Sequence, residues 1–253
     1  MARWSLLPLL LTQGLWTALR TPRLPPAPGP VEGAIGAGEA VSLLALGDSI
    51  IAGVGVARSE EALPAQLAGA IAAQGGQAVH WQARGLNGAR SGWLLEQLAT
   101  PDGLIATPDI VVFSNGINDV TTIRSEAAVV GQLQAVITAA ESRFPGALVF
   151  QLGLPPLGVF PALPQPLRQV LGRRSDRIDT ALDAWLAQRP RAHFLPFESL
   201  PRAEQFARDG YHPAAPAVAL WAESLAPTIT ERLSRPGGPA QPDRPHDRAR
   251  HAS

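Results

Sequence analysis

Residues 41–53 read VSLLALGDSIIAG, and this stretch decides the fold. Its first half, 41–46, is a continuous apolar run, which is typical of a strand buried on both faces. Gly47, Asp48 and Ser49 follow, where a turn would expose the Ser49 hydroxyl and its backbone N–H together. Alone, such a tripeptide can arise by chance, and a Ser before a helix is usually only an N-cap. The stretch predicts a central strand with a candidate polar site at its end.

Strands and helices alternate along the rest of this region. Further strands are predicted at 78–83, 110–114, 147–152 and 192–195, and helices at 63–74, 93–99, 125–143, 168–187 and 215–233. Strands alternating with helices of this length pair in parallel, because a parallel crossover needs a dozen or more residues. The pattern predicts an α/β domain, a three-layer α/β/α sandwich of flavodoxin-like type with about five parallel strands. In such sheets the site lies beyond the carboxyl ends of the strands.

The two ends of the chain differ in composition from this domain, which we place at 41–233. Residues 4–19 carry no charge and are flanked by arginines, but they are short for a spanning helix. Two interpretations stay open: a signal or membrane-anchoring segment, with possible membrane association, or an N-terminal helix on the domain surface or a mis-assigned start. The rest of 1–40 contains a Pro- and Gly-rich linker at 24–38, expected to form neither helix nor strand. Residues 234–253 are predicted to be a disordered tail.

Composition excludes several classes of protein. The 253 residues are 46% hydrophobic and 17% charged, as in globular domains. The 21 Lys+Arg balance the 21 Asp+Glu, so no basic field argues for nucleic acid. The absence of Lys excludes a P-loop, and the absence of Cys excludes thiol catalysis and thiolate metal sites. No histidines cluster at ligand spacing, so we expect neither a metal nor a cofactor. Composition does not choose between an exported or anchored protein and a cytoplasmic one.

Polar clusters follow four of the five predicted strands. Taken singly, each has an ordinary structural explanation as a turn, a helix start or a surface hydrogen-bonded pair. Together they supply what acyl-bond hydrolysis requires, namely an activated hydroxyl, an imidazole, a group to orient it and oxyanion donors. Ser49, His212 and Asp209 fill the first three roles. The donors are the N–H groups of Ser49 and Gly92 and the side chain of Asn118. We therefore predict a catalytic site at this edge of the sheet.

At these residues the sequence resembles the SGNH (GDSL) hydrolase superfamily, a family of serine esterases, whose four blocks occur here in order. They are Gly-Asp-Ser-x-x-x-Gly at 47–53, a glycine at Gly92, Gly-x-Asn-Asp at 116–119, and Asp-x-x-His at 209–212. The resemblance implies a Ser49–His212–Asp209 triad and an oxyanion hole formed by Ser49, Gly92 and Asn118, without metal or cofactor. Ile50 departs from the pattern, since Leu is commoner there, and Gly88 lies close to the second block's glycine.

The resemblance predicts hydrolysis of carboxylic esters, with small, medium-chain or lipid-like esters as the leading substrates. A carbohydrate O-acetyl esterase is the alternative of the same chemistry, and a non-catalytic binding module on the same fold is the alternative of another class. Trp93 could line the acyl pocket or be a core aromatic. Asp48 and Asp119 are interpreted as turn-fixing side chains. Residues 154–166, apolar and Pro-rich, could form a lip over the pocket or pack on the domain.

Overall fold

The computed structural model describes residues 7–100, 102–197 and 202–235. Six strands form one sheet in the order β1-β3-β2-β4-β5-β6. Five of them run parallel, and β1 is antiparallel to its neighbour β3. The strands are β1 (Glu32–Ile35), β2 (Ala40–Gly47), β3 (Ala78–Gly85), β4 (Ile110–Ser114), β5 (Leu148–Leu152) and β6 (Ala192–Leu195). The predicted parallel sheet is confirmed, with one antiparallel edge strand added.

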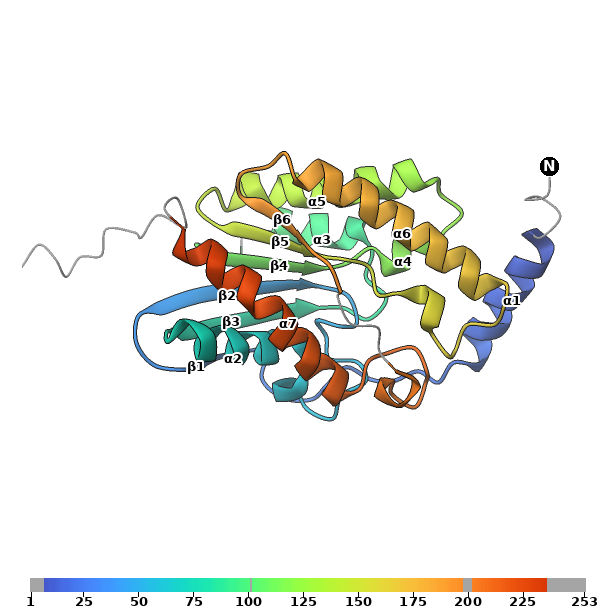
Figure 1. The fold of residues 1–253 in the computed structure, drawn as a ribbon, viewed down its shortest axis with the longest axis horizontal. Coiled ribbons are helices and arrows are strands. Elements are labelled where there is room, and N and C mark those ends of the chain that lie inside the picture. The colour runs from blue at the N-terminus through green and yellow to red at the C-terminus, as the bar shows by residue number, and fades with distance from the viewer. Residues whose placement is uncertain (1–6, 101, 198–201, 236–253) are drawn as a thin grey trace, which may run out of the picture.

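Helices cover both faces of the sheet, so the molecule has three layers (Figure 1). One face packs against α2 and α7, and the other against α3, α5 and α6. The helices are α1 (Leu7–Arg20), α2 (Leu63–Gly75), α3 (Ser91–Ala99), α4 (Ile117–Val120), α5 (Glu126–Arg143), α6 (Leu167–Leu186) and α7 (Ala215–Ser234). The five helices predicted within the domain are all present, with ends within about two residues of the prediction.

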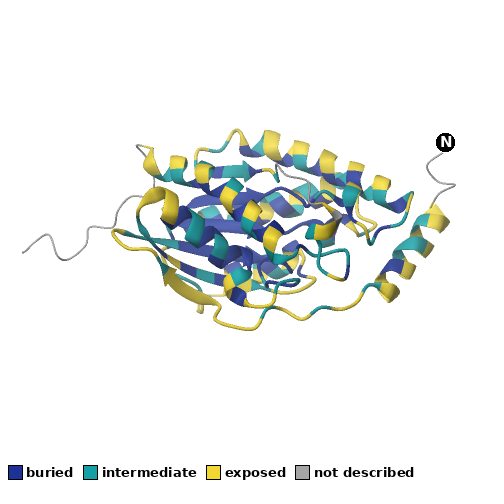
Figure 2. Ribbon diagram, turned by 60° about the horizontal axis from the view of Figure 1, so that its bottom comes forward, coloured by how far each residue is buried: buried dark blue, intermediate teal, exposed yellow. Residues whose placement is uncertain are grey.

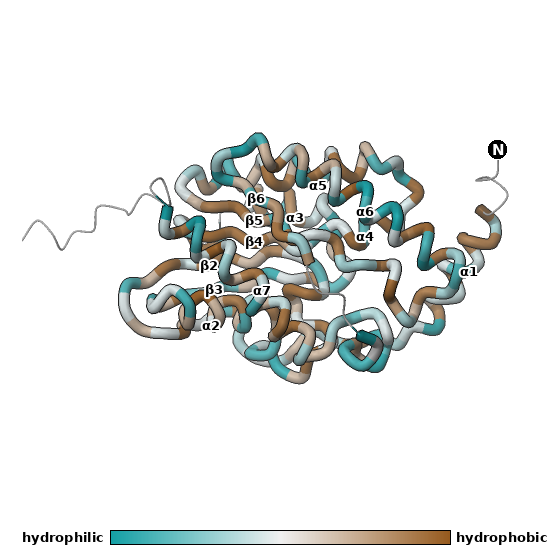
Figure 3. The backbone as a smooth tube through the Cα atoms, in the orientation of Figure 1, coloured by the Kyte–Doolittle hydropathy of each residue, from teal (hydrophilic) through white to brown (hydrophobic). Residues whose placement is uncertain are grey.

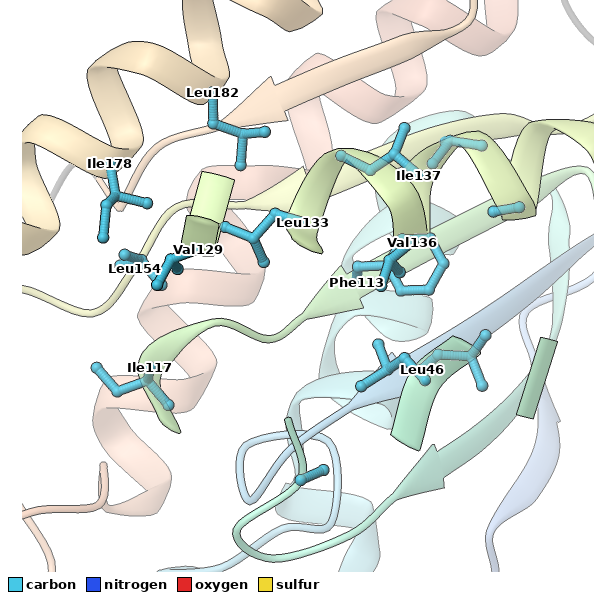
Figure 4. Close-up of a cluster of buried hydrophobic side chains, with 14 of the residues drawn as sticks. Leu46, Phe113, Ile117, Val129, Leu133, Val136, Ile137, Leu154, Ile178 and Leu182 are labelled. Atoms are coloured by element: carbon cyan, nitrogen blue, oxygen red, sulfur yellow. The ribbon is translucent and has the colours of Figure 1, made fainter. Parts of the chain in front are cut away.

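The core explains why the central strands are apolar on both faces. Every residue of β4 and of β5 is buried, because helices lie above and below each strand. Figure 4 shows one half of this core, in which Leu46 and Phe113 from the sheet face Val136 and Ile137 of α5. Burial of such side chains stabilises the fold by about 1.5–3 kcal/mol each. The burial pattern in Figure 2 follows the same layers.

The edge strand β1 was not predicted, because the linker at 24–38 was expected to contain neither helix nor strand. That expectation is wrong for Glu32–Ile35, which pairs with β3 from Glu32↔Gln82 to Ile35↔Val79. Three of its four residues are exposed, so it carries no hydrophobic signal. Gly33 lies over the ring of Trp81, and a Cβ there would be 3.0 Å from the indole nitrogen. The glycine therefore allows close packing of the strand on Trp81 and does not mark a loop.

The N-terminal segment forms α1, a helix on the surface of the domain. Gln13 attaches it, because its Nε2 donates to Gln165 O at 2.6 Å and its Oε1 accepts from Leu167 N at 3.1 Å. The structure shows residues 7–20 as a helix docked on the domain, while residues 4–6 lie outside the described part. The signal or membrane-anchoring interpretation of residues 4–19 stays a prediction. Among the described residues, no helix has the length and apolar character needed to cross a membrane. Of the predicted tail, 236–253 lies outside the described residues.

Candidate functional site

Ser49 lies at the end of β2 in a turn that buried hydrogen bonds hold in place. The Asp48 N–H donates to Ser114 O at 2.9 Å, and Asp48 Oδ1 accepts from Ile50 N at 3.1 Å and from Ser114 Oγ at 3.3 Å. Gly47 is required here, because a Cβ would lie 2.2 Å from Ser114 O. The interpretation of Asp48 as a turn-fixing side chain is confirmed. Ser49 itself is 7% exposed.

Asp209 and His212 form a hydrogen-bonded pair in the loop before α7. Asp209 Oδ2 lies 2.6 Å from His212 Nδ1, and Asp209 Oδ1 accepts from the backbone N–H groups of Tyr211 and His212 at 3.0 Å each. Burial raises the pKa of Asp209, but these hydrogen bonds outweigh it and bring the pKa below its usual range. An ionised carboxylate can only accept, so the ring proton is placed on Nδ1 and Nε2 keeps its lone pair.

The loop that carries Ser49 packs closely against the loop that carries His212. At Gly55, where φ is +107°, a Cβ would lie 2.5 Å from Pro213 O and 3.0 Å from the Cβ of His212. Only glycine tolerates both this backbone conformation and this approach. Ser49 and His212 line one cavity of about 20 Å³. Residues about 160 positions apart in the chain are thus brought to one place, as predicted.

Most of the other walls of this cavity are apolar or aromatic. They are formed by Ile50, Ile117, Pro155, Phe160, Phe206, Tyr211, Pro213 and Trp221. Phe160 stacks edge-on against both Phe206 and Tyr211, with ring centroids 5.2 Å apart in each pair. Pro155 and Phe160 belong to the segment 154–166, so part of that segment borders the cavity as the lip interpretation expects. Leu154, Leu157 and Leu163 are buried in the core, so the segment also packs on the domain. Phe206 was missed, because one aromatic residue in a polar loop gives no pattern.

Asn118 lies in the short helix α4, directly after β4. Its Nδ2 donates one hydrogen bond to Ala89 O at 2.9 Å, which fixes the orientation of the amide. A primary amide carries two N–H groups, and the second has no partner among the described residues. Gly116 allows the turn into α4, since its φ is +107° and a Cβ would lie 2.9 Å from Leu154 Cδ2. The residue before Asn118, Ile117, lines the cavity.

Gly92 is the second residue of α3, where a backbone N–H has no partner within the helix. A buried network joins this helix start to α4, because Asp119 Oδ2 accepts from both Ser91 N and Ser91 Oγ at 3.1 Å. Asn115 Nδ2 also donates to Ser91 Oγ, at 3.3 Å. Asp119 therefore holds the start of α3 against α4, which agrees with its interpretation as a turn-fixing side chain. Ser91 was missed, although it directly precedes Gly92 in the second block.

Two features lie apart from the Ser49–His212 cavity. Trp93 packs against the core on the α3 side of the sheet. Like Gly92 and Asn118, it is not among the residues that line the cavity. Its proposed role in substrate binding stays a prediction. A larger groove of about 550 Å³ lies between β1, α2 and α7. Its lining holds none of the predicted site residues, so size alone would point to the wrong place.

Comparison with known proteins fits this arrangement. The model of the GDSL-like lipase/acylhydrolase family matches residues 45–220, which include every block of the candidate site. The chain belongs to this family. Within it, a GDSL-like esterase of Mycobacterium tuberculosis is 31% identical over 207 residues, which is 78% of this chain. The match spans 65% of that relative's own length.

Solved structures of a lipase and of a carbohydrate esterase share the fold. A lipase from a goat rumen metagenome superposes with a TM-score of 0.59 at 18% identity, covering 76% of this chain and 99% of that one. A carbohydrate esterase family 2 enzyme of Myceliophthora fergusii gives a TM-score of 0.55 at 20% identity, covering 84% and 69%. At this level of identity the likeness concerns the fold. The GDSL-like lipase/acylhydrolase family, to which the chain belongs, is a family of hydrolytic esterases.

Proposed function

We propose that this protein is a serine acylhydrolase that cleaves carboxylic esters through Ser49, His212 and Asp209. One observation carries the proposal: His212, whose imidazole Nδ1 lies 2.6 Å from the buried Asp209 carboxylate, lines the same small cavity as Ser49. A nucleophile, a base and an orienting group in this relation are what covalent acyl transfer requires. A protein that only bound esters would need the cavity but not the oriented imidazole.

The reaction proceeds in two steps, acylation of Ser49 and hydrolysis of the acyl-enzyme. Ser49 Oγ attacks the acyl carbonyl while His212 Nε2 takes the hydroxyl proton, and the resulting imidazolium is stabilised by Asp209. Collapse of the tetrahedral intermediate breaks the bond to the alcohol, which leaves with the proton from Nε2. A water molecule then repeats the sequence on the acyl-enzyme, releases the carboxylic acid and restores the Ser49 hydroxyl.

The oxyanion of each tetrahedral intermediate is held by the N–H groups of Ser49 and Gly92 and by the second N–H of the Asn118 amide. The hydrogen bond from Asn118 to Ala89 O supports this role, because it fixes the amide before substrate arrives. The Asp119–Ser91 contact supports it as well, since it ties the helix start that contains Gly92 to the helix that contains Asn118. Donors fixed in this way need no reorganisation during reaction.

Replacing Asn118 by alanine is expected to lower kcat by about 10²–10³-fold with little change in KM, because the lost donor acts mainly in the transition state. Steady-state kinetics with p-nitrophenyl acetate measure both constants. Asn87→Ala is the matched control, since this exposed amide contacts only Leu24 O, at 3.5 Å, among the described residues. An unchanged kcat for the Asn118 variant would remove this residue from the oxyanion hole.

The size of the cavity favours short acyl groups. A volume of about 20 Å³ admits little more than one water-sized group, whereas pockets for drug-sized ligands measure about 300–1,000 Å³. We therefore expect acetyl esters to be the preferred substrates, whether the alcohol is a carbohydrate or a small alkyl group. Turnover of p-nitrophenyl acetate, butyrate and octanoate, beside acetylated sugars, tests this. Equal or faster turnover of octanoate would contradict the short-acyl assignment.

The pH dependence of kcat/KM reports the charges around the base. We expect kcat/KM to rise with pH, because His212 must be unprotonated to accept a proton and Asp209, with its lowered pKa, stays ionised throughout. Burial raises the pKa of the nearby Asp48 to about 7, against the field of His212. An ionised Asp48 favours the protonated imidazole, so Asp48→Asn should move the rise to lower pH.

Profiles of the wild type and of the Asp48→Asn variant, recorded where acylation limits the rate, check this expectation. Asparagine can keep the hydrogen bonds from Ile50 N and Ser114 Oγ through its Oδ1, so the turn that holds Ser49 is retained. A flat wild-type profile would count against His212 as the base. A shift of the variant to higher pH would contradict the assigned effect of Asp48.

A further inference from the structure

Helix α1 turns most of its hydrophobic side chains away from the domain on which it packs. The face that contacts the domain consists of Leu10, Gln13, Gly14 and Thr17, spaced as one side of a helix. Only one of these residues is a large apolar one, and the buried Thr17 hydroxyl has no partner among the described residues. A surface helix normally turns its apolar stripe inward, so α1 is inverted.

The outward face of α1 is apolar instead. Leu11 and Leu15 follow each other at a helical spacing of four residues, with exposed fractions of 54% and 64%. Trp16 and Leu19 extend the same side, with 49% and 77% exposed. Figures 2 and 3 show α1 at the edge of the molecule with its outer side exposed and apolar residues along its length. Contiguous exposed apolar surface of this kind marks a site of interaction.

The charges that follow this face along the chain have one sign. The first acidic residue of the chain is Glu32, whereas Arg20 and Arg23 follow directly after the leucine-rich face. The guanidinium of Arg20 lies 5.0 Å from the centroid of the Trp16 ring. An aromatic residue beside an arginine at the edge of an apolar helix face suits the boundary between lipid tails and headgroups. A second copy of the chain would instead bring like charges together.

The position of α1 connects this face to the Ser49–His212 cavity. Gln13 holds the helix to Gln165 and Leu167. These residues continue the segment that contains Phe160, which lines the cavity. Figure 1 shows α1 at the end of the molecule toward which the parallel strands run. A surface that received α1 would therefore lie beside the edge of the sheet that carries the candidate site.

We propose that α1 lies flat in the headgroup region of an anionic lipid surface, with Leu11, Leu15, Trp16 and Leu19 inserted and Arg20 and Arg23 against lipid phosphates. Its 14 residues span about 21 Å, less than the hydrocarbon core of a bilayer at about 30 Å, so the helix lies on the membrane rather than across it. This surface contact is additional to the proposed esterase function and does not depend on catalysis.

Co-sedimentation of the full chain with lipid vesicles tests the proposal. We expect the protein to pellet with vesicles of phosphatidylcholine containing 30% phosphatidylglycerol, and much less with phosphatidylcholine alone, because the arginines favour anionic headgroups. The double variant Leu11→Gln/Leu15→Gln should weaken binding at least about tenfold, since it removes inserted apolar area. The matched control is Ile123→Gln/Leu220→Gln, which changes residues 89% and 48% exposed, one in the loop before α5 and one on α7.

The control variant should bind like the wild type, and both double variants should keep wild-type turnover of p-nitrophenyl acetate, which shows that they are folded. The experiment is repeated with Ser49→Ala, so that loss of lipid binding and loss of catalysis are read separately. The proposal would be overturned if the wild type pelleted with neither kind of vesicle. Equal loss in the control variant, or sedimentation velocity showing self-association through α1 without vesicle binding, would also overturn it.

Discussion

Replacing Ser49 by alanine is expected to lower kcat/KM for p-nitrophenyl acetate by about 10⁴-fold or more, because no other group can form the acyl-enzyme. The loss should fall almost entirely on kcat, since the walls of the cavity that hold the acyl group are unchanged. Initial-rate kinetics against the uncatalysed reaction measure it. Some acceleration over water should remain, because the oxyanion donors at Gly92 and Asn118 are still present.

Ser42→Ala provides the matched control for this change. Ser42 is also a serine of β2, and its hydroxyl contacts Asp109 Oδ2 at 2.8 Å near the opposite end of the strand. We expect turnover in this control to stay near that of the wild type. Turnover by the Ser49 variant equal to that of the wild type would refute the catalytic proposal and favour a binding module on this fold.

The change of Asp209 to asparagine should cost about 10⁴-fold in kcat with little change in the fold, because it reverses the tautomer of His212. The backbone N–H groups of Tyr211 and His212 both donate to Oδ1, so they would hold the oxygen of the new amide in that position. The amide nitrogen would then face His212 Nδ1 and donate to it. The ring proton moves to Nε2, which can no longer accept a proton from Ser49.

Asp109→Asn is the control for this variant, since Asp109 also accepts from a backbone N–H and a side chain, those of Ser42, at 2.8 Å each. It should leave kcat near the wild-type value. Thermal unfolding of both variants separates loss of activity from loss of structure. An Asp209→Asn enzyme with full kcat would show that this carboxylate does not set the state of the imidazole.

The elements with strong periodicity could be predicted from the sequence. The strand at 110–114 is an unbroken apolar run and is buried throughout. The helix expected from 125 starts at Glu126, with Ser125 as an N-cap whose Oγ accepts from Ala128 N at 3.2 Å. In both cases the local pattern and the tertiary packing favour the same structure, which is why the prediction holds.

The edge strand β1 and the orientation of α1 could not be predicted in the same way. Glu32–Ile35 becomes a strand because β3 offers an unpaired edge and Trp81 offers a flat surface for Gly33, and neither is visible in the local sequence. The apolar residues of 4–19 left two interpretations open, a signal or membrane-anchoring segment, or an N-terminal helix on the domain surface or a mis-assigned start. Only the structure shows that Gln13 faces the domain while Leu15 faces outward.

The candidate site could likewise be predicted only in part from the sequence. The positions of Ser49, Asn118 and His212 beyond strand ends follow from the βα pattern, because parallel strands bring their carboxyl ends to one edge. The size of the cavity does not follow, since its walls come from loops far apart in the chain, such as those containing Phe160 and Phe206. Substrate range depends on those walls and therefore needs the structure.

Labelling with a p-nitrophenyl phosphonate tests the central claim most directly. The Ser49 oxygen would attack phosphorus, expel p-nitrophenolate and form a stable ester that mimics the tetrahedral intermediate. We predict one adduct per chain by intact mass, placed on Ser49 by peptide sequencing, with labelling much slower in the Asp209→Asn variant. An adduct on a different residue, or persistent ester hydrolysis with Ser49 unmodified, would contradict the account.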